Sequence, residues 1–413
     1  MATQTVEIER LAAGGDGLGY INGKVCFVPY GVPKDRLEVE ITQQNKKFYR
    51  ARIKVIVRPS MDRVTPPCPH FTHCGGCQWL HINEETQLSA KEAILGHALQ
   101  TQVSVTPSRP PLGYRSVVRL HVGAEAERVV VGFVHARKRK IVEIEHCPIL
   151  AEPLDAALPT LSRLARISGR PDGEIRLTQS DPGPVAFYFA NAPLPEAFYR
   201  AVRDGAGRSI SGLSLVSDGL ETRLAGAASI ETTGTDNVRF EAPAKSFGQA
   251  NRQINLEIAR TIDHWLSQRR FKSAIELFAG AGNHTITIAP HVPDMRASEI
   301  DTAACDAMTR NLHRRRLTHV KVEQGEALDR YRASNRHTDL VVLNPPRTGH
   351  LALASAMASG DHRAILYISC NPATLARDLA ELRTTGYNIS NAKGFDMFPH
   401  TAHMEAAVLL ERT

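Results

Sequence analysis

The first 58 residues alternate apolar and polar positions in short runs, which glycines and prolines interrupt. The clearest runs lie at residues 24–28, 37–41 and 52–56. Alternation with a period of two is typical of strands that bury one face. Several such strands with turn residues between them predict a small, OB-like β-barrel. We interpret the glycine run at residues 14–19 as a turn of this barrel, because no strongly apolar strand precedes it and no helical pattern follows it.

From about residue 246 onward the pattern changes. Short apolar runs at residues 275–278, 339–343 and 364–369 each end at a glycine-rich or polar loop, and stretches of helical pattern lie between them. This alternation predicts a doubly wound, Rossmann-like α/β sheet, whose ligands bind at the C-terminal ends of the strands.

The region between these two parts has a mixed pattern, and we expect it to be mostly β. Residues 119–122 and 129–133 resemble paired strands, and a basic tip at residues 136–140 precedes a further strand. Residues 161–241 carry no chemistry that we recognise. A chain of 413 residues exceeds what one hydrophobic core usually organises. We therefore predict three domains, at residues 1–58, 59–245 and 246–413.

The chain is basic, with a formal net charge of +7 and a pI of about 9.1, which favours an anionic partner. Six barrel residues could follow a phosphate backbone or simply form a solvated strand face: Lys46, Lys47, Arg50, Arg52, Lys54 and Arg58. We see neither a signal-peptide pattern nor an apolar run long enough to span a membrane. We therefore expect a soluble, cytoplasmic protein without a membrane partner.

Seven cysteines are present, and the odd number argues against a secreted disulfide framework. Cys68, Cys74 and Cys77 form C-x5-C-x2-C, and Cys147 follows at a distance within His-Cys-Pro. Four thiolates can hold either zinc or an iron–sulfur cluster. Zinc ribbons usually offer two C-x2-C pairs, and here the second pair is missing. The spacing therefore favours iron–sulfur and leaves zinc as the alternative.

Residues 276–283 read Glu-Leu-Phe-Ala-Gly-Ala-Gly-Asn and predict a strand, a glycine-rich turn and the start of a helix. Glycines let the backbone approach a nucleoside closely. Glu299 follows at a second strand end, where a carboxylate can accept hydrogen bonds from both ribose hydroxyls. Together with Asn344 of Asn-Pro-Pro-Arg, these motifs indicate an S-adenosylmethionine site. A turn that binds another nucleotide is the alternative.

Cys370 comes directly after a buried strand, at the edge of the predicted cleft. A thiolate there suits nucleophilic catalysis on uracil, because its addition to C6 makes C5 nucleophilic enough to accept a methyl group. A base must then remove the C5 proton. Glu405 is the only carboxylate of the motif M-F-P-H-T-A-H-M-E and is our candidate. His400 and His403 are alternative bases, although such histidines more often order a loop or lie at the surface.

Taken together, these motifs resemble those of the RNA 5-methyluridine methyltransferases. The likeness is to the 23S rRNA uracil-C5 type, which has an N-terminal TRAM barrel and a [4Fe-4S] cluster. It covers nearly the whole chain and rests on C-P-H-F-T-H-C-G-G-C-Q, H-A-R-K-R-K…E-H-C-P-I-L, S-C-N-P-A-T-L-A-R-D-L and M-F-P-H-T-A-H-M-E. The resemblance implies structured RNA as the partner and favours ribosomal over transfer RNA.

The resemblance also implies roles for individual residues. Cys370 is expected to be the nucleophile and Glu405 the proton acceptor. The cluster ligands are expected to be Cys68, Cys74, Cys77 and Cys147. The S-adenosylmethionine and uracil sites are expected to be lined by Gln249, Phe278, Asn283, Glu299, Glu326 and Asn344. Phe247 falls where the family places an aromatic ring beside the target base, and such a ring suits stacking on an extruded nucleotide.

Two positions depart from the family pattern. Asn344 stands where the family usually has aspartate. Its amide can accept from N3–H and donate to O4 of uracil, but the flipped amide also suits cytosine. Glu326 stands where a relative has an uncharged amide, and a carboxylate there can still meet the adenine amine.

Two other functions are compatible with parts of the sequence. Methyltransferases that act on exocyclic amines use a similar Asn-Pro-Pro motif, but they have an aromatic residue where Arg347 stands. A non-catalytic RNA-binding iron–sulfur protein is the second. The presence of Cys370, Glu405 and the glycine turn in one chain argues against it.

Overall fold

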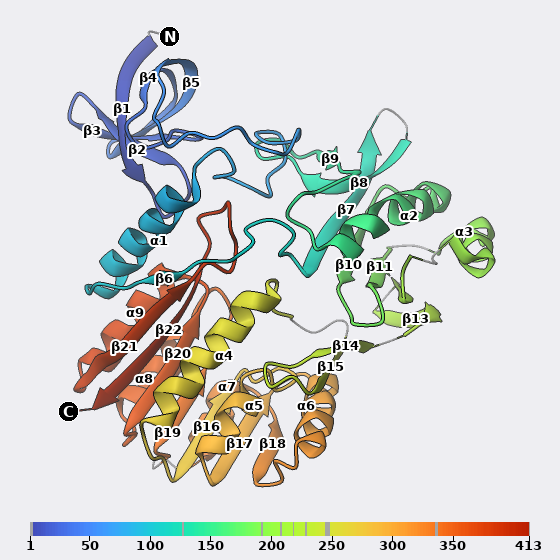
Figure 1. Cartoon of the computed structure of the whole chain (residues 1–413), viewed down its shortest axis with the longest axis vertical. Helices are drawn as coiled ribbons and strands as arrows, with labels where there is room; N and C mark the ends of the chain where they lie inside the picture. Colours follow the sequence, from blue (N-terminus) through green and yellow to red (C-terminus); the bar gives the residue numbers. More distant parts are fainter. Residues whose placement is uncertain are drawn as a thin grey trace.

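The computed structural model describes residues 3–125, 128–190, 193–206, 209–217, 219–227, 229–243, 248–334 and 338–412. Figure 1 shows a β-barrel at the N-terminal end, a central sheet beside it and a large α/β sheet that contains the C-terminus. Among the helices of these residues, none combines the length and the apolar character that crossing a membrane requires.

The N-terminal segment forms the predicted barrel. Its strands are β1 (Thr3–Leu11), β2 (Gly17–Ile21), β3 (Lys24–Val28), β4 (Arg36–Gln44) and β5 (Phe48–Arg58). They close in the order β1-β2-β3-β5-β4. Alternate side chains such as Val6, Ile8, Val28 and Val39 fill the interior, because closing the sheet buries one face of every strand. The glycine run leads from the end of β1 into β2, as predicted.

The central part is a seven-stranded sheet with helices on it. Its strands are β7 (Val117–Glu125), β8 (Arg128–Val134), β9 (Ile141–Glu143), β10 (Gly173–Thr178), β11 (Val185–Phe189), β12 (Gly212–Ser217) and β13 (Leu220–Gly226). They pair in the order β13-β12-β11-β10-β7-β8-β9. The predicted pairing of β7 with β8 is confirmed, with His121 opposite Gly132.

The expectation of a mostly β central part missed its helices. These are α2 (Glu152–Ser168) and α3 (Glu196–Ala201), which continues into the π-helical turn η1 (Val202–Ala206). Helix α2 buries Leu154, Leu158 and Leu161 in the same core as the strands of the sheet. A separate hairpin of β14 (Ser229–Thr233) and β15 (Arg239–Pro243) follows the sheet.

The C-terminal part is an eight-stranded sheet. Its strands are β16 (Ser273–Leu277), β17 (Asp294–Glu299), β18 (Val320–Gln324), β19 (Leu340–Leu343), β20 (Ala364–Ser369), β21 (Tyr387–Phe395), β22 (Glu405–Arg412) and the short β6 (Val105–Thr106). The order is β18-β17-β16-β19-β20-β22-β21-β6. Its helices are α4 (Arg252–Ser267), α5 (Thr285–Ile288), the 3₁₀ turn η2 (Ala289–His291), α6 (Thr302–Arg314), α7 (Ala327–Ala333), α8 (Leu351–Ala358) and α9 (Pro372–Arg383).

The three apolar runs of the sequence are the strands β16, β19 and β20, so the predicted Rossmann-like sheet is confirmed. The first five strands of the sheet order are parallel, and β22 then runs antiparallel to β20. Chain order reverses on either side of β16, which makes the carboxyl ends of β16 and β19 the expected place for a ligand.

One helix of the predicted central domain lies on the C-terminal sheet. This is α1 (Glu84–Leu99), which packs against α9 and β21 and shares their core through Leu95 and Leu99. The strand β6 follows it and pairs with β21 at the edge of the same sheet. The division of the chain at residues 58 and 245 stays a prediction.

Candidate active site

Cys370 and Glu405 lie side by side although they are distant in the sequence. Ser369 ends β20 and pairs with Ala406 of β22. Cys370 lies in a bend directly after Ser369, and Glu405 directly precedes Ala406 in β22, so the two residues flank the last pair of this ladder. Glu405 is close enough for its charge to act on the Cys370 thiol. The insertion of β22 between β20 and β21 therefore brings the two predicted catalytic residues together.

Both groups are held in their neutral form in the free protein. Burial, together with the nearby Glu405 carboxylate, raises the pKa of the half-buried Cys370 thiol to about 11. Glu405 is only 5 % exposed, and this burial raises the pKa of its carboxyl group to about 8. Arg347 acts in the opposite direction and favours the Cys370 thiolate. The positive end of α9, which begins directly after Cys370 and Asn371, is also suited to a thiolate.

The loop after β19 is fixed to the loop that carries Cys370. Asn371 donates from Nδ2 to the Arg347 carbonyl at 3.1 Å, and Thr374 Oγ1 donates to the same oxygen at 3.2 Å. The Arg347 guanidinium comes within 3.5 Å of Nδ1 of His403. Asn344, half-buried, starts this loop at the carboxyl end of β19. The Asn-Pro-Pro-Arg and Ser-Cys-Asn-Pro motifs thus form one rim.

The glycine-rich turn begins where β16 ends. Phe278 adopts φ 62°, and Gly280 and Gly282 also have positive φ, so the backbone turns sharply under a prospective ligand. Glu299 ends the neighbouring strand β17 and accepts from Gly280 N at 2.9 Å. Its other oxygen accepts from Ile300 N at 2.8 Å. These bonds orient the carboxylate while leaving it acceptor capacity for ribose hydroxyls.

Three other predicted cofactor residues have defined surroundings. Asn283 exchanges two amide hydrogen bonds, of 2.8 and 2.9 Å, with Asn255 of α4. Glu326 caps α7 by accepting from Leu328 N at 2.8 Å. Gln249 is half-buried, and its carbonyl accepts from Ser116 Oγ at 3.1 Å. Phe247 lies outside the described residues.

Sequence reasoning missed two residues at this edge. His350 lies between two predicted residues, with its ring centroid 5.8 Å from that of Phe278 and its Nε2 3.7 Å from a Glu326 oxygen. Ile300 is 65 % exposed directly after Glu299. Its position directly after Glu299 is the signal that the sequence offers, since an apolar side chain beside a strand-end carboxylate suits an adenine face.

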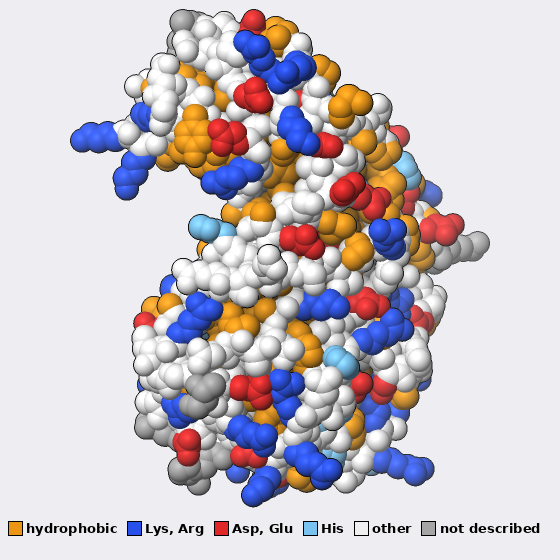
Figure 2. Space-filling view, turned by 60° about the vertical axis from the view of Figure 1, so that its left-hand side comes forward, with side chains coloured by type: hydrophobic (Ala, Val, Ile, Leu, Met, Phe, Trp, Pro, Cys, Tyr) orange, Lys and Arg blue, Asp and Glu red, His pale blue; other side chains and the backbone are white. Residues whose placement is uncertain are grey.

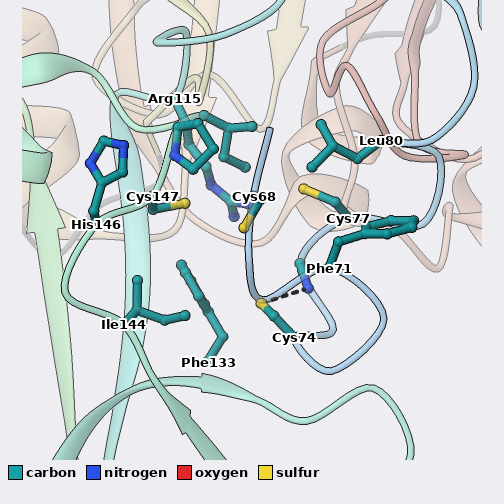
Figure 3. Close-up of a pocket in the computed structure, with 13 residues that line it drawn as sticks. Cys68, Phe71, Cys74, Cys77, Leu80, Arg115, Phe133, Ile144, His146 and Cys147 are labelled. Atoms are coloured by element: carbon teal, nitrogen blue, oxygen red, sulfur yellow. Dashed lines mark hydrogen bonds between the residues drawn. The ribbon is translucent and has the colours of Figure 1, made fainter. Parts of the chain in front are cut away.

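The four clustered cysteines line one pocket between the cysteine loop and the central sheet, and Figure 3 shows their sulfurs turned toward a common space. Phe71, Leu80, Phe133 and Ile144 complete an apolar lining. Burial and the neighbouring thiols raise the pKa of Cys147 to about 11 and that of Cys77 further. Within the described parts of the chain, no three His, Cys, Asp or Glu side chains stand where they could hold a single metal ion.

The basic residues of the barrel and of the loop between β8 and β9 differ in their ion pairs with acidic side chains. On the barrel, Arg50 pairs with Asp16 at 3.0 Å and Arg52 with Glu40 at 2.7 Å. The basic tip of residues 137–140, between β8 and β9, is exposed along its whole length. Figure 2 shows a broad hollow in one face of the molecule, with basic side chains projecting at its upper rim.

Comparisons with known proteins agree with this architecture. A family profile described as "tRNA (Uracil-5-)-methyltransferase" matches residues 230–413, and a TRAM domain profile matches residues 2–54. The chain is 32% identical, over 99% of its length and 96% of the relative's, to "23S rRNA (uracil(1939)-C(5))-methyltransferase RlmD" of Salmonella paratyphi A. The protein of the same name from Vibrio parahaemolyticus is 28% identical, over 99% of this chain and 96% of that one.

A solved structure also resembles the whole chain. It is the Pyrococcus abyssi tRNA (uracil-54, C5)-methyltransferase in complex with S-adenosyl-L-homocysteine. The TM-score is 0.76, and the match covers 98% of this chain and 100% of the other, at 23% sequence identity. At this identity the likeness shows a shared fold.

Proposed function

Because the chain belongs to the RNA uracil-C5 methyltransferase family, we propose that it methylates uracil through a covalent adduct in which Cys370 is the nucleophile and Glu405 the base. The protein is an S-adenosylmethionine-dependent enzyme that methylates C5 of uracil in RNA. The observation that carries the proposed mechanism is the register that sets Cys370 beside Glu405.

The proposed chemistry follows from the position of the two groups. The Cys370 thiolate adds to C6, and the pair of electrons from the C5–C6 double bond moves toward C5. S-adenosylmethionine would supply an electrophilic methyl group: C5 bonds the methyl carbon while the methyl–sulfur bond breaks, and S-adenosylhomocysteine is the leaving group. Glu405 removes the C5 proton, the double bond re-forms and the thiolate leaves from C6. Because C5 and C6 are adjacent atoms, the base has to lie beside the nucleophile, as Glu405 does.

Burial fits Glu405 for proton abstraction. A carboxylate with a pKa of about 8 binds a proton more strongly than an exposed one, so it is the better acceptor from carbon. His400 and His403 are poorer candidates, because burial lowers the pKa of both and that of His400 to about 4.

We propose that Glu299 holds the ribose of S-adenosylmethionine and that Phe278, Asn283 and Glu326 line the remainder of its site. The backbone bonds to Glu299 support its role, because they fix both carboxylate oxygens at the strand end. Gln249 and Asn344 are also proposed to line the cofactor site, and Asn344 and Phe247 are proposed to contact the uracil. Asn344 supports uracil recognition as an acceptor for N3–H and a donor to O4.

We further propose that Cys68, Cys74, Cys77 and Cys147 hold a [4Fe-4S] cluster. The thiols of one zinc site lie about 3.8 Å apart, whereas a cluster spreads its four thiolates over four irons. The four sulfurs line one apolar pocket, and the missing second C-x2-C pair favours the larger group over zinc. Anaerobically purified protein should be brown with about four irons per chain. Colourless protein with one zinc would contradict the cluster.

We propose ribosomal RNA as the substrate, by analogy with the relatives named for 23S rRNA. Nucleoside analysis of ribosomal RNA from a strain that lacks the gene should show one or more missing 5-methyluridines, which can then be mapped by position. Intact ribosomal RNA with 5-methyluridine missing only from transfer RNA would redirect the assignment.

Two substitutions test the mechanism because they should fail differently. Cys370→Ala should abolish methylation and form no adduct, since the ring is never activated. Glu405→Gln should allow addition and methyl transfer but stall before elimination, so a protein–RNA adduct should survive denaturing electrophoresis. Loss of a general base costs about 100- to 10,000-fold in rate, enough for the stalled adduct to be visible. Full activity of Cys370→Ala would contradict the mechanism.

A further inference from the structure

Glu405 follows a loop, residues 396–404, that we call the base loop. It joins β21 to β22 and turns at His400, which has φ 64°. A non-glycine residue in this region is strained, and it persists only where surrounding contacts hold it. The contacts of His400 therefore help to fix how the base loop presents Glu405, beside those that Lys91 makes with Asp396 and with the Phe398 carbonyl.

The main contacts of His400 come from the end of the cysteine loop, residues 68–79. Two consecutive backbone amides, Gln78 N and Trp79 N, donate to the His400 carbonyl at 3.0 and 2.8 Å. These residues directly follow Cys77. The cysteine loop and the base loop are thus joined at one carbonyl oxygen.

Gln87 of α1 closes this junction. Its Oε1 accepts from His400 N at 2.9 Å, and its Nε2 donates to the Trp79 carbonyl at 3.1 Å. Nε2 also donates to the Ile82 carbonyl at 2.7 Å. The Gln87 side chain is buried, at 2 % exposure. One amide therefore bonds the backbone of both loops, where unpaired groups would be costly.

The cysteine loop is bonded on its other sides to the parts that carry basic residues. Gly75 N donates to the Val134 carbonyl at 3.0 Å and Ala136 N to the His73 carbonyl at 2.8 Å, at the root of the basic tip. The Trp79 indole donates to the Gly15 carbonyl of the barrel at 2.8 Å. The loop therefore lies between the proposed RNA-binding elements and the proposed base.

We infer that the cysteine loop is the positioning element of the base loop, and that its order is transmitted to Glu405 through the Gln78, Trp79 and Gln87 bonds to His400. The inference rests on the proposed role of Glu405. It also gives the four cysteines a structural role. A group bound to their sulfurs would order the cysteine loop, and the last two backbone amides of that loop bond the His400 carbonyl.

Gln87→Met tests the inference, because it keeps the volume and removes the bonds to both loops. Ser180→Ala is the matched control, since Ser180 is also buried and bonds both the N–H and the carbonyl of Glu231, far from both loops in the sequence. Hydrogen exchange of residues 396–405 should rise about 10-fold in Gln87→Met and stay unchanged in Ser180→Ala. If Gln87→Met does not fold, the chelation experiment below tests the same junction in the natural protein.

Two assays separate addition of the Cys370 thiolate from the later elimination step. With RNA that contains 5-fluorouracil, Gln87→Met should form the Cys370 adduct within about 2-fold of the natural rate, because addition does not need the base. Turnover of ordinary RNA should fall about 10-fold, since elimination needs it. Full turnover by Glu405→Gln would contradict the proposed catalytic role of Glu405. Hydrogen exchange in Gln87→Met would still show whether the bonds to His400 order the base loop.

A second measurement starts at the cysteines. Chelation of the metal from natural protein should raise hydrogen exchange in residues 68–79 and 396–405 together, and leave that of α6 unchanged. Exchange in residues 396–405 that is unaffected both by Gln87→Met and by chelation would overturn the inference.

Discussion

Cys370 and Glu405 are neutral at rest for the same physical reason, which is burial. A thiol with a pKa of about 11 resists oxidation at neutral pH, because oxidants attack the thiolate. Arg347 and the start of α9 offer the thiolate a favourable field, so it can form when the ring arrives.

The raised pKa values predict the direction of the pH dependence. Glu405 carries a proton below about pH 8 and can act as a base only above it, and Cys370 also has to lose its proton. The value of kcat/KM should therefore rise from pH 6 to pH 9, with RNA affinity measured separately at each pH. A flat profile, or one that falls over this range with unchanged affinity, would show that these groups are not the ones that titrate.

Residue types and spacing were enough to propose Cys370, Glu405 and Glu299 as candidates, because each belongs to a recognisable strand end or motif. Their adjacency was not predictable. Cys370 meets Glu405 only because β22 inserts antiparallel between β20 and β21, and periodicity within one segment does not reveal its pairing with another. His350 escaped notice for a similar reason, since its partners Phe278 and Glu326 come from other loops.

At the scale of elements, the alternation of apolar and polar positions correctly predicted the barrel and the paired strands β7 and β8. Helix α2 carries an amphipathic pattern that could have been recognised, with Leu154, Leu158 and Leu161 on its buried face. Helix α1 offered no such signal, because its buried face includes the polar Gln87 and Lys91. Those polar residues are buried for their bonds to distant loops, which only the folded structure brings near.

The basic tip should contribute more to RNA binding than Arg50 and Arg52 do, because those two pair with acids at 3.0 and 2.7 Å, whereas the ion pair of the tip, Lys140 with Glu125, is longer, at 3.7 Å. Replacing residues 137–140 by alanine should weaken RNA binding and make it less sensitive to salt, by roughly one unit of slope per lost phosphate contact. The affinity for S-adenosylmethionine should not change. Arg270→Ala with Lys272→Ala, two exposed residues before β16, is the control. Unchanged RNA affinity would make the tip a solvated turn.

At the scale of the whole molecule, parts that are consecutive in the sequence are interleaved in space. Helix α1 and strand β6 belong to the predicted central domain, yet they complete the C-terminal sheet (Figure 1). A buried ion pair strengthens this connection: the Lys91 ammonium bonds Asp396 and donates to the Phe398 carbonyl at 3.1 Å. Local patterns could not have predicted the interleaving, since it depends on contacts between distant segments.

This ion pair makes a prediction about stability. Lys91 is fully buried and Asp396 is 6 % exposed, so Lys91→Met leaves a buried carboxyl group without its partner. Removing one member of such a pair typically costs about 3–5 kcal/mol in the free energy of unfolding. Denaturant unfolding of Lys91→Met and of Lys34→Met should show this loss only in the first, because Lys34 pairs with Asp62 at the exposed surface. Equal stability would mean that the core tolerates an unpaired Asp396.

The most direct test of the account is to capture the covalent intermediate on the natural protein. RNA that carries 5-fluorouracil at the target position should accept the Cys370 thiolate at C6 and the methyl group at C5. It should then remain attached, because C5 carries fluorine in place of the proton that Glu405 would remove. Denaturing electrophoresis should show the adduct only in the presence of S-adenosylmethionine, and mass spectrometry of the digested protein should place the modified nucleotide on the peptide with Cys370. The absence of any adduct from enzyme that methylates ordinary RNA, or attachment to another residue, would contradict the mechanism.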